Sequence, residues 1–332
     1  MRLVFMGTPE YACPTLACLV HSEHEVAAVV TGPDVRPPRG GGLHPTPVKR
    51  EALRHGLTVL TPATLRNNPA LREALAGLKA DVFVVVAFKI LPRSLYALPR
   101  LGSVNIHASL LPRYRGAAPI HWALINGETE TGLSSFVLND TVDTGDLVLQ
   151  ERVPIDPADT FDSLYARMAA LSGPFALRSL ERLADPAFAP IPQDGTAATP
   201  APKVTPEDAL IDWGFPAPLV HNFIRGLSSV PGAYSTFRSR RVKILGSRPV
   251  VDAPAAPGAP PGAIVPDRRR LLVQCASSAL ELTRWCRRGR RGWTGCPFST
   301  ACSRSRASDS EPHRTTFRIP YEESDSRQLN RL

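Results

Sequence analysis

The sequence predicts an α/β fold in which a Rossmann-like, mostly parallel sheet precedes a smaller open β-barrel. Apolar runs of strand length alternate with helix-like runs over residues 1–183, which is typical of a parallel sheet covered by helices. After residue 206, short strand-like runs separated by turn residues replace this alternation. Such a pattern indicates a small antiparallel domain of the OB-like barrel type.

Strands and helices of the first domain, residues 1–183, follow one another regularly. Short apolar runs predict strands at residues 2–6, 25–31, 81–87, 103–107 and 131–138. The run at 81–87 is apolar and rich in β-branched residues, as a central parallel strand requires. Helices are expected at residues 14–20, 46–55 and 161–183. The second of these has Thr46 as its cap, Pro47 in its first turn and Gly56 as its stop signal.

The second half of the chain divides into three parts. Residues 184–206 are dense in proline and alanine and lack periodicity, which predicts a linker. Residues 207–282 are expected to form the barrel, with a short helix at 216–226 before its strands. The expected strands are residues 232–237, 241–245, 262–265, 271–275 and 279–282. Residues 283–332 show no strand or helix periodicity and are predicted to be a disordered tail.

The charge distribution indicates the kind of partner. Residues 1–202 carry 18 Lys and Arg against 19 Asp and Glu, whereas residues 203–332 carry 21 against 11. A neutral domain followed by a basic one favours a polyanion such as nucleic acid, with solubility as the alternative explanation. The tail holds eleven Arg and five acidic residues, so it supplies more than half of the basic excess.

No segment of the first domain predicts a membrane or metal site. The apolar run at 82–88 is too short to cross a bilayer, and residues 1–6 are too short for a signal-peptide core. We therefore expect a cytoplasmic protein with no membrane partner. None of the six cysteines forms a C-x-x-C pair, so no metal is expected.

Asn105 and His107 are the first candidate catalytic residues. They are two apart on a predicted strand, so their side chains point the same way. At the carboxyl end of a central strand, where α/β sheets bind ligands, an amide and an imidazole suit polarisation of a carbonyl and proton transfer. Core filling is the less favoured alternative. The later D-T-G-D at 143–146 predicts either a plain turn or a carboxylate, that of Asp143, that orients His107.

Two glycine-rich segments complete the set of candidates. The loop at 32–42 contains Arg36, Arg39 and three consecutive glycines. It suits either a phosphate-rich partner or simple exposure to solvent. The turn after the first strand, G-T-P-E at 7–10, lacks the G-x-G-x-x-G pattern, so a dinucleotide site is not supported.

Together these segments resemble the methionyl-tRNA formyltransferases. The run N-I-H-A-S-L-L-P-R-Y-R-G at 105–116 is highly specific to folate-dependent formyltransferases. The family's order and spacing are also matched by P-T-P-V-K at 45–49, D-T-G-D at 143–146, I-D-W at 211–213, P-G-A-Y at 231–234 and V-K-I at 242–244. The resemblance covers residues 1 to about 282 and implies a formyltransferase fold with a second domain that helps to hold tRNA.

The resemblance implies transfer of the formyl group of 10-formyltetrahydrofolate to the α-amino group of methionyl-initiator tRNA, without a metal. Asn105 and His107 would stabilise the oxyanion, while Asp143 would fix the protonation of His107 and relay a proton. Folate contacts are expected from Ser109, Leu110, Leu111, Pro112, Phe88 and Ile90. Contacts with tRNA are expected from Arg36, Arg39, Gly40, Gly41 and Lys243. We expect a monomer.

Three departures from the family pattern stand out. The loop at 39–42 is R-G-G-G where the family has G-R-G, which leaves open which arginine contacts tRNA. The segment at 87–92 lacks the family's Tyr-Gly pair. The family also ends with a helix bearing M-x-G-x-x-F-L-x-G. If the codons of residues 293–302 are read one nucleotide earlier, permissive third bases give M-D-G-V-P-F-L-N-G-V. We therefore interpret residues 283–332 as frameshifted.

Two alternatives stay open. One is a formyltransferase of the same superfamily that acts on an amino sugar nucleotide. A glycinamide ribonucleotide enzyme is disfavoured, because it needs neither the arginine loop nor a second domain with I-D-W at 211–213. The other alternative is an inactive scaffold that binds tRNA, which the presence of Asn105, His107 and Asp143 disfavours and the altered tail favours.

Overall fold

The computed structural model describes residues 1–36, 42–254, 258–289 and 292–296. The chain divides into two compact units. The first contains Met1–Val204 and Pro218–Pro231, and the second contains Thr205–Ala217 and the residues from Gly232 onward. Among the described residues, no helix is both long enough and apolar enough to span a membrane.

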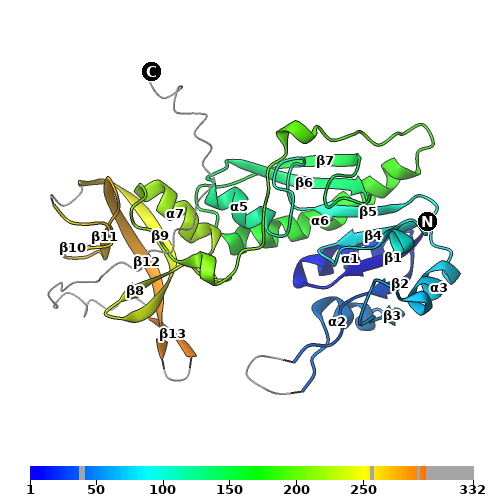
Figure 1. The fold of residues 1–332 in the computed structure, drawn as a ribbon, viewed down its shortest axis with the longest axis horizontal. Helices are drawn as coiled ribbons and strands as arrows, with labels where there is room; N and C mark the ends of the chain where they lie inside the picture. The colour runs from blue at the N-terminus through cyan, green and yellow to red at the C-terminus, as the bar shows by residue number, and fades with distance from the viewer. Residues whose placement is uncertain (37–41, 255–257, 290–291, 297–332) are drawn as a thin grey trace. The chain divides into compact units, whose positions relative to one another are not determined.

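The first unit is built on a mixed sheet (Figure 1). Its strands are β1 (Arg2–Gly7), β2 (Glu25–Val30), β3 (Val59–Leu60), β4 (Val82–Val86), β5 (Ser103–His107), β6 (Glu130–Val137) and β7 (Leu147–Pro154). Within the described residues the order is β3-β2-β1-β4-β5-β6-β7. Pairing is parallel from β3 to β5 and antiparallel between β5, β6 and β7. The predicted mostly parallel sheet is confirmed.

Helices cover both faces of this sheet. They are α1 (Cys13–Val20), α2 (Pro47–Arg54), α3 (Pro69–Gly77), α4 (Arg93–Tyr96), α5 (Pro119–Ile125) and α6 (Phe161–Ala184), with a 3-10 turn η1 (Glu10–Ala12) before α1. Side chains alternate along β1, so Leu3 and Phe5 enter one apolar core and Val4 and Met6 enter another. The first core contains residues of α1 and α6, and the second contains residues of α3 and α4.

The strand order creates a crevice. The chain moves from β1 to β2 on one side and later to β4 on the other, so the direction of winding reverses between β1 and β4. Ligands of open α/β sheets bind at such a reversal, beyond the carboxyl ends of the strands. Strand β6 runs antiparallel to β5 and pairs its last residue, Val137, with Val104. The loop after β6 must therefore turn back to reach the carboxyl end of β5.

The segment predicted as a linker is part of the first unit as far as Val204. Ile191 pairs with Leu147 of β7, and the Ala201 N–H donates to the Arg115 carbonyl at 2.6 Å. Most of α7 (Ala217–Gly226), which the sequence assigns to the second domain, also belongs to this unit. These contacts use backbone hydrogen bonds, which leave no periodic pattern in the sequence.

The second unit is an open antiparallel half-barrel, as predicted. Its described elements are η3 (Glu207–Ala209), β8 (Tyr234–Phe237), β9 (Arg240–Pro254), β10 (Ile264–Val265), β11 (Leu272–Gln274), β12 (Ser278–Gly289) and β13 (Gly292–Cys296). Strand β12 continues beyond the predicted end of the barrel at Leu282 and pairs with β13. Residues 297–332 lie outside the described residues, and the frameshift near Thr283 stays a prediction.

Packing of α6 on α1 generates a stability prediction. A Cβ atom on Gly173 of α6 would lie 2.7 Å from the Cys18 Cβ and 3.1 Å from the Pro14 carbonyl oxygen of α1. Gly173→Ala should therefore lower the free energy of unfolding by about 1–3 kcal/mol through overpacking. Chemical denaturation measures this change.

Gly77→Ala in α3 is the matched control, because no described atom outside its chain neighbours and its own helix backbone lies within 4 Å of the added Cβ. The gain in helix propensity should leave the stability unchanged or raise it by up to about 1 kcal/mol. Equal destabilisation by both substitutions would contradict the packing argument.

Candidate active site

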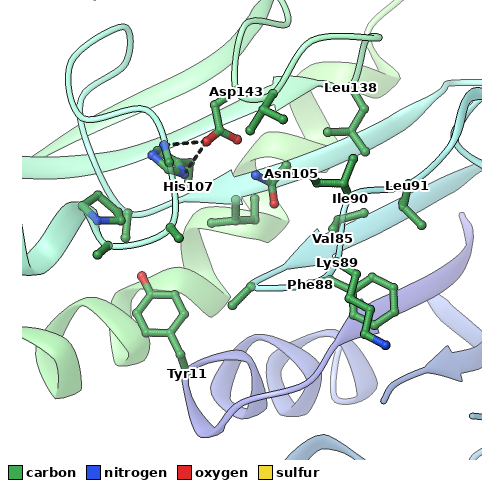
Figure 2. Close-up of a pocket in the computed structure, with 18 of the residues that line it drawn as sticks. Tyr11, Val85, Phe88, Lys89, Ile90, Leu91, Asn105, His107, Leu138 and Asp143 are labelled. Atoms are coloured by element: carbon green, nitrogen blue, oxygen red, sulfur yellow. Dashed lines mark hydrogen bonds and ion pairs between the residues drawn. The ribbon is translucent and has the colours of Figure 1, made fainter. Parts of the chain in front are cut away.

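Strand β5 places Asn105 and His107 on one side, as their spacing predicts, and both line one pocket (Figure 2). Asn105 pairs with Val85 of β4 and with Phe136 of β6, so it lies in the middle of the sheet. Within the part of the chain that the structure describes, its half-buried carboxamide makes no hydrogen bond to protein. The amide is therefore available to a ligand.

The orientation of the His107 imidazole is fixed by a backbone contact. Its Nε2 lies 2.9 Å from the Tyr114 carbonyl oxygen, and only 6% of the residue is exposed. Because a carbonyl only accepts hydrogen bonds, Nε2 carries a hydrogen and donates it. Nδ1 faces the Asp143 carboxylate, with 3.9 Å between Nδ1 and Oδ2 (Figure 2). Nδ1 is thus the ring atom that can take up and release a proton in the pocket.

Asp143 lies in a tight turn that directs its carboxylate towards His107. Its φ angle is +55°, in the left-handed region. The Gly116 N–H donates to the same Oδ2 that faces His107, at 2.8 Å. Two residues later, a Cβ atom on Gly145 would lie 1.7 Å from the Val137 carbonyl oxygen, so only glycine fits there. The two interpretations of D-T-G-D are therefore compatible: the segment is a turn, and Asp143 faces His107.

The pocket beside these groups has a volume of about 820 Å³ and lies at the carboxyl ends of β4 and β5. Its apolar lining includes Val85, Phe88, Ile90, Leu91, Leu138 and Val142. The polar groups Asn105, His107 and Asp143 also line it. An apolar cavity of this size with a few polar groups suits a small organic ligand or cofactor. Phe88 and Ile90, both predicted ligand contacts, are among the lining residues.

Two parts of the pocket wall were not predicted from the sequence. Leu138–Val142 line it directly before Asp143, and their position next to a candidate catalytic residue is a signal that was available. The second part is aromatic and consists of Tyr11, His121, Phe161 and Tyr165. His121 and Phe161 stack with ring centroids 3.8 Å apart and an interplanar angle of 3°. Burial lowers the pKa of His121, so its ring is neutral at neutral pH.

The predicted ligand contacts from Ser109 to Pro112 do not line this pocket. The Leu110 side chain lies against Gly132 of β6, and Leu111 is buried. The Ser134 hydroxyl accepts from the Leu111 N–H at 3.0 Å and donates to the Ser109 carbonyl at 2.6 Å. These contacts hold the loop that carries Tyr114 and Gly116. Direct binding of a ligand by residues 109–112 stays a prediction.

Of the predicted polyanion contacts that the structure describes, neither Arg36 nor Lys243 is a lining residue of the pocket. Arg36 is exposed in a loop whose base is closed by two hydrogen bonds between Val35 and His44, each 2.9 Å long. The Lys49 ammonium pairs with Asp34 at 2.7 Å beside it. Arg39, Gly40 and Gly41 lie outside the described residues. Lys243 belongs to β9 of the second unit, where its side chain lies over Gly232.

Comparison with known sequences identifies relatives of both units. A family model described as formyl transferase matches residues 1–178, and one described as formyl transferase, C-terminal domain, matches residues 203–296. The methionyl-tRNA formyltransferase of Moorella thermoacetica is 44% identical over 284 residues, which cover 85% of this chain and 90% of that protein. That of Solibacter usitatus is 44% identical over 302 residues, 90% of this chain and 95% of that protein.

Solved structures support the fold. HypX from Aquifex aeolicus, in complex with tetrahydrofolic acid, superimposes with a TM-score of 0.60 at 20% identity and covers 90% of this chain and 46% of its own. An N-formyltransferase from Helicobacter canadensis, in complex with folinic acid and dTDP-3-aminofucose, gives a TM-score of 0.63 at 17% identity. It covers 84% of this chain and 98% of its own. The predicted formyltransferase fold is confirmed.

Tyr114, whose carbonyl holds His107, generates a prediction on alkaline stability. Burial and a 2.6 Å hydrogen bond to Glu128 raise the pKa of its hydroxyl to about 12, compared with about 10 in an unfolded chain. The folded protein keeps this proton to higher pH, so the stabilisation is full below pH 10 and is lost as the pH rises towards about 12. In Tyr114→Phe, the free energy of unfolding measured in urea should fall less steeply as the pH rises.

Some loss of stability at alkaline pH should persist in Tyr114→Phe, because burial also raises the pKa values of Tyr11 and Tyr165. Tyr96→Phe is a comparison variant: a hydrogen bond to Asp140 also raises the pKa of Tyr96, but this contact is exposed, so the variant should reduce the loss less than Tyr114→Phe does. Identical alkaline slopes for wild type and Tyr114→Phe would show that Tyr114 ionises normally.

Proposed function

The chain belongs to the methionyl-tRNA formyltransferase family, and on that premise we propose that it transfers the formyl group of 10-formyltetrahydrofolate to the α-amino group of methionyl-initiator tRNA. The product would be the formylated tRNA that begins translation. The observation that carries the proposal is the convergence of Asn105, His107 and Asp143 on one pocket. An amide donor, an imidazole and a carboxylate are the groups that an acyl transfer to an amine requires.

The pocket fits a folate-derived formyl donor by its chemistry. Phe88, Ile90 and Leu91 offer apolar surface to a flat heterocycle, and the Asn105 amide, which has no hydrogen-bond partner among the described residues, lies on the same lining. When bound, the folate supplies a formyl carbon that is open to attack by an amine. Leu138 and Val142 extend the apolar lining next to Asp143, so the donor's ring system would be kept from water there.

The protein's task is placement and stabilisation of charge. A free α-amine has a pKa of about 7.7–8.0, so a useful fraction is neutral near pH 7 and needs no strong base. Asn105 donates a hydrogen bond to the formyl oxygen as charge develops there. The Asp143–His107 pair would accept the proton that the amine loses on attack, and the folate nitrogen would leave. The same pair returns a proton to the departing nitrogen.

The tRNA would be held by positive charge from both units. Arg36, Arg39 and the glycines that follow would contact phosphates from the loop at 32–42. Lys243 would contribute from β9 of the second unit. Contacts of this kind fix the register of a nucleic acid and depend on salt concentration. We propose that one chain suffices, so the active species is a monomer.

Asn105→Ala should lower kcat for formyl transfer by about 10²–10³-fold, because it removes the donor to the developing oxyanion. Asn105→Asp should lose as much, since it keeps the size of the side chain and replaces the donor by an acceptor. The Kd for initiator tRNA should stay within about twofold, because tRNA affinity comes from phosphate contacts elsewhere. Steady-state kinetics and filter binding measure the two quantities.

Wild-type protein assayed with methionyl-initiator tRNA and with a dTDP-amino sugar, in parallel, is the control for substrate identity. Transfer to the sugar nucleotide and not to tRNA would overturn the proposed function. Absence of any transfer by wild type, with tRNA binding intact, would instead favour the inactive scaffold.

Arg36→Ala and Lys243→Ala should each raise the Kd for initiator tRNA and reduce the salt dependence of log Kd by about 0.7–0.9 per lost phosphate contact. Their kcat at saturating tRNA should be unchanged, because neither residue lines the pocket. Binding titrations at several salt concentrations give both values. Arg72→Ala, at an exposed position of α3, should change neither, and an effect equal to that of Arg36→Ala would indicate a non-specific loss of charge.

A further inference from the structure

The segment between α6 and the second unit is bound along the catalytic loops by a series of hydrogen bonds. The Tyr114 N–H donates to the Thr199 hydroxyl at 2.9 Å, and the Arg115 N–H donates to the Thr199 carbonyl at 2.9 Å. The Ala118 N–H donates to the Ala201 carbonyl at 3.1 Å, and the Trp122 indole donates to the Pro202 carbonyl at 2.8 Å. We call residues 191–202 the brace. It contacts the loop that carries Tyr114 and Gly116, and both of those residues contact the catalytic groups.

Gln193 is the residue of the brace that joins the two catalytic loops. Its Oε1 accepts from the Arg115 Nη2 at 2.6 Å and from Nε at 3.2 Å. Its Nε2 donates to the Gly145 carbonyl at 2.8 Å and to the Asp143 carbonyl at 3.1 Å. The carboxamide thus uses two acceptor positions and two donors, which is its full capacity. The partners also fix its orientation, since guanidinium groups only donate and carbonyls only accept.

The turn that Gln193 holds needs an external support. Asp143 has a positive φ of +55°, a conformation that L-residues with a side chain rarely adopt. Among the described residues, Gln193 donates hydrogen bonds to the carbonyls of both Asp143 and Gly145. The backbone on either side of Thr144 is therefore held at two points. Gln193 also accepts from the Arg115 side chain, and the next residue, Gly116, donates its N–H to the Asp143 carboxylate. The two loops are therefore joined both through Gln193 and directly.

We propose that Gln193 is a positioning residue that holds the Asp143 carboxylate opposite the His107 imidazole by joining Arg115 to the backbone of the 143–145 turn. The inference rests on the proposed function, because it assigns Gln193 to the same reaction. Gln193 is absent from the pocket lining, so it acts through Asp143 and not on a substrate. A misplacement of about 1 Å in a catalytic group can cost about 10²-fold in rate.

Gln193→Ala should lower kcat by roughly 10–100-fold while the KM values for both substrates stay within about twofold. Gln193→Glu should lose a similar amount, because its carboxylate keeps the Arg115 contact and places an oxygen against the carbonyls of Asp143 and Gly145. Asp194→Ala is the matched control. The side chain of Asp194 is exposed and bonds within the brace to Thr196, and this variant should keep wild-type kcat.

A double-mutant cycle separates positioning from a general loss of structure. If Gln193 acts through Asp143, Gln193→Ala should change the residual rate of Asp143→Ala by less than about twofold. A further loss of tenfold or more in that background would overturn the proposal. So would an unchanged kcat in Gln193→Ala.

Crystal structures of wild type and Gln193→Ala give a readout that does not depend on formyl transfer. The distance between His107 Nδ1 and Asp143 Oδ2 should remain near 3.9 Å in wild type and lengthen by about 1 Å or more in the variant. An unchanged distance would refute positioning by Gln193 even if the enzyme transfers formyl groups. A lengthened distance in a chain with no transferase activity would uphold the structural role and remove the proposed function alone.

Discussion

The hydrogen bond from the Gly116 N–H to the Asp143 carboxylate is the interaction on which the site depends. Strand β6 runs antiparallel to β5, so it ends beside the start of β5, and the chain that leads to Asp143 leaves the sheet at the opposite end of β5 from His107. The loop must therefore turn back, and it does so through a residue with positive φ and a glycine packed on the Val137 carbonyl. The bond to Gly116 holds the Asp143 carboxylate, and Gln193 donates to the Asp143 carbonyl.

The three proposed catalytic groups differ in the number of hydrogen-bond partners that the protein gives them. The His107 ring and the Asp143 carboxylate are held by backbone partners, whereas the Asn105 amide has none among the described residues. A polar group without a partner costs about 1–3 kcal/mol when water is removed from it. A bound carbonyl would recover this free energy, and would recover more as negative charge accumulates. The Asn105 amide is thus the polar group of the proposed set that a ligand could satisfy.

Sequence patterns predicted the parts of the molecule that follow a period. The parallel strands and the common direction of Asn105 and His107 follow from two-residue alternation on an apolar strand. The brace left no such signal, because it binds mainly through backbone groups and a single glutamine. Contacts of residues 109–112 with folate, implied by family likeness, stay a prediction, and the structure shows that Leu110 packs on Gly132 and that Leu111 is buried. A motif shared by a family does not distinguish residues that form a loop from those that touch a ligand.

The position of the brace has a consequence for how this protein can be divided. All three proposed catalytic side chains precede α6, and an N-terminal fragment ending with that helix would contain each of them. Such a fragment would nevertheless lack the chain that orders Tyr114, Arg115 and the 143–145 turn. The first unit, which would have to be exchanged or inherited as a whole, therefore extends past residue 204 to include most of α7 and the chain as far as Pro231, well beyond the last proposed catalytic residue. Grafting of new acceptor domains onto this scaffold should keep that boundary.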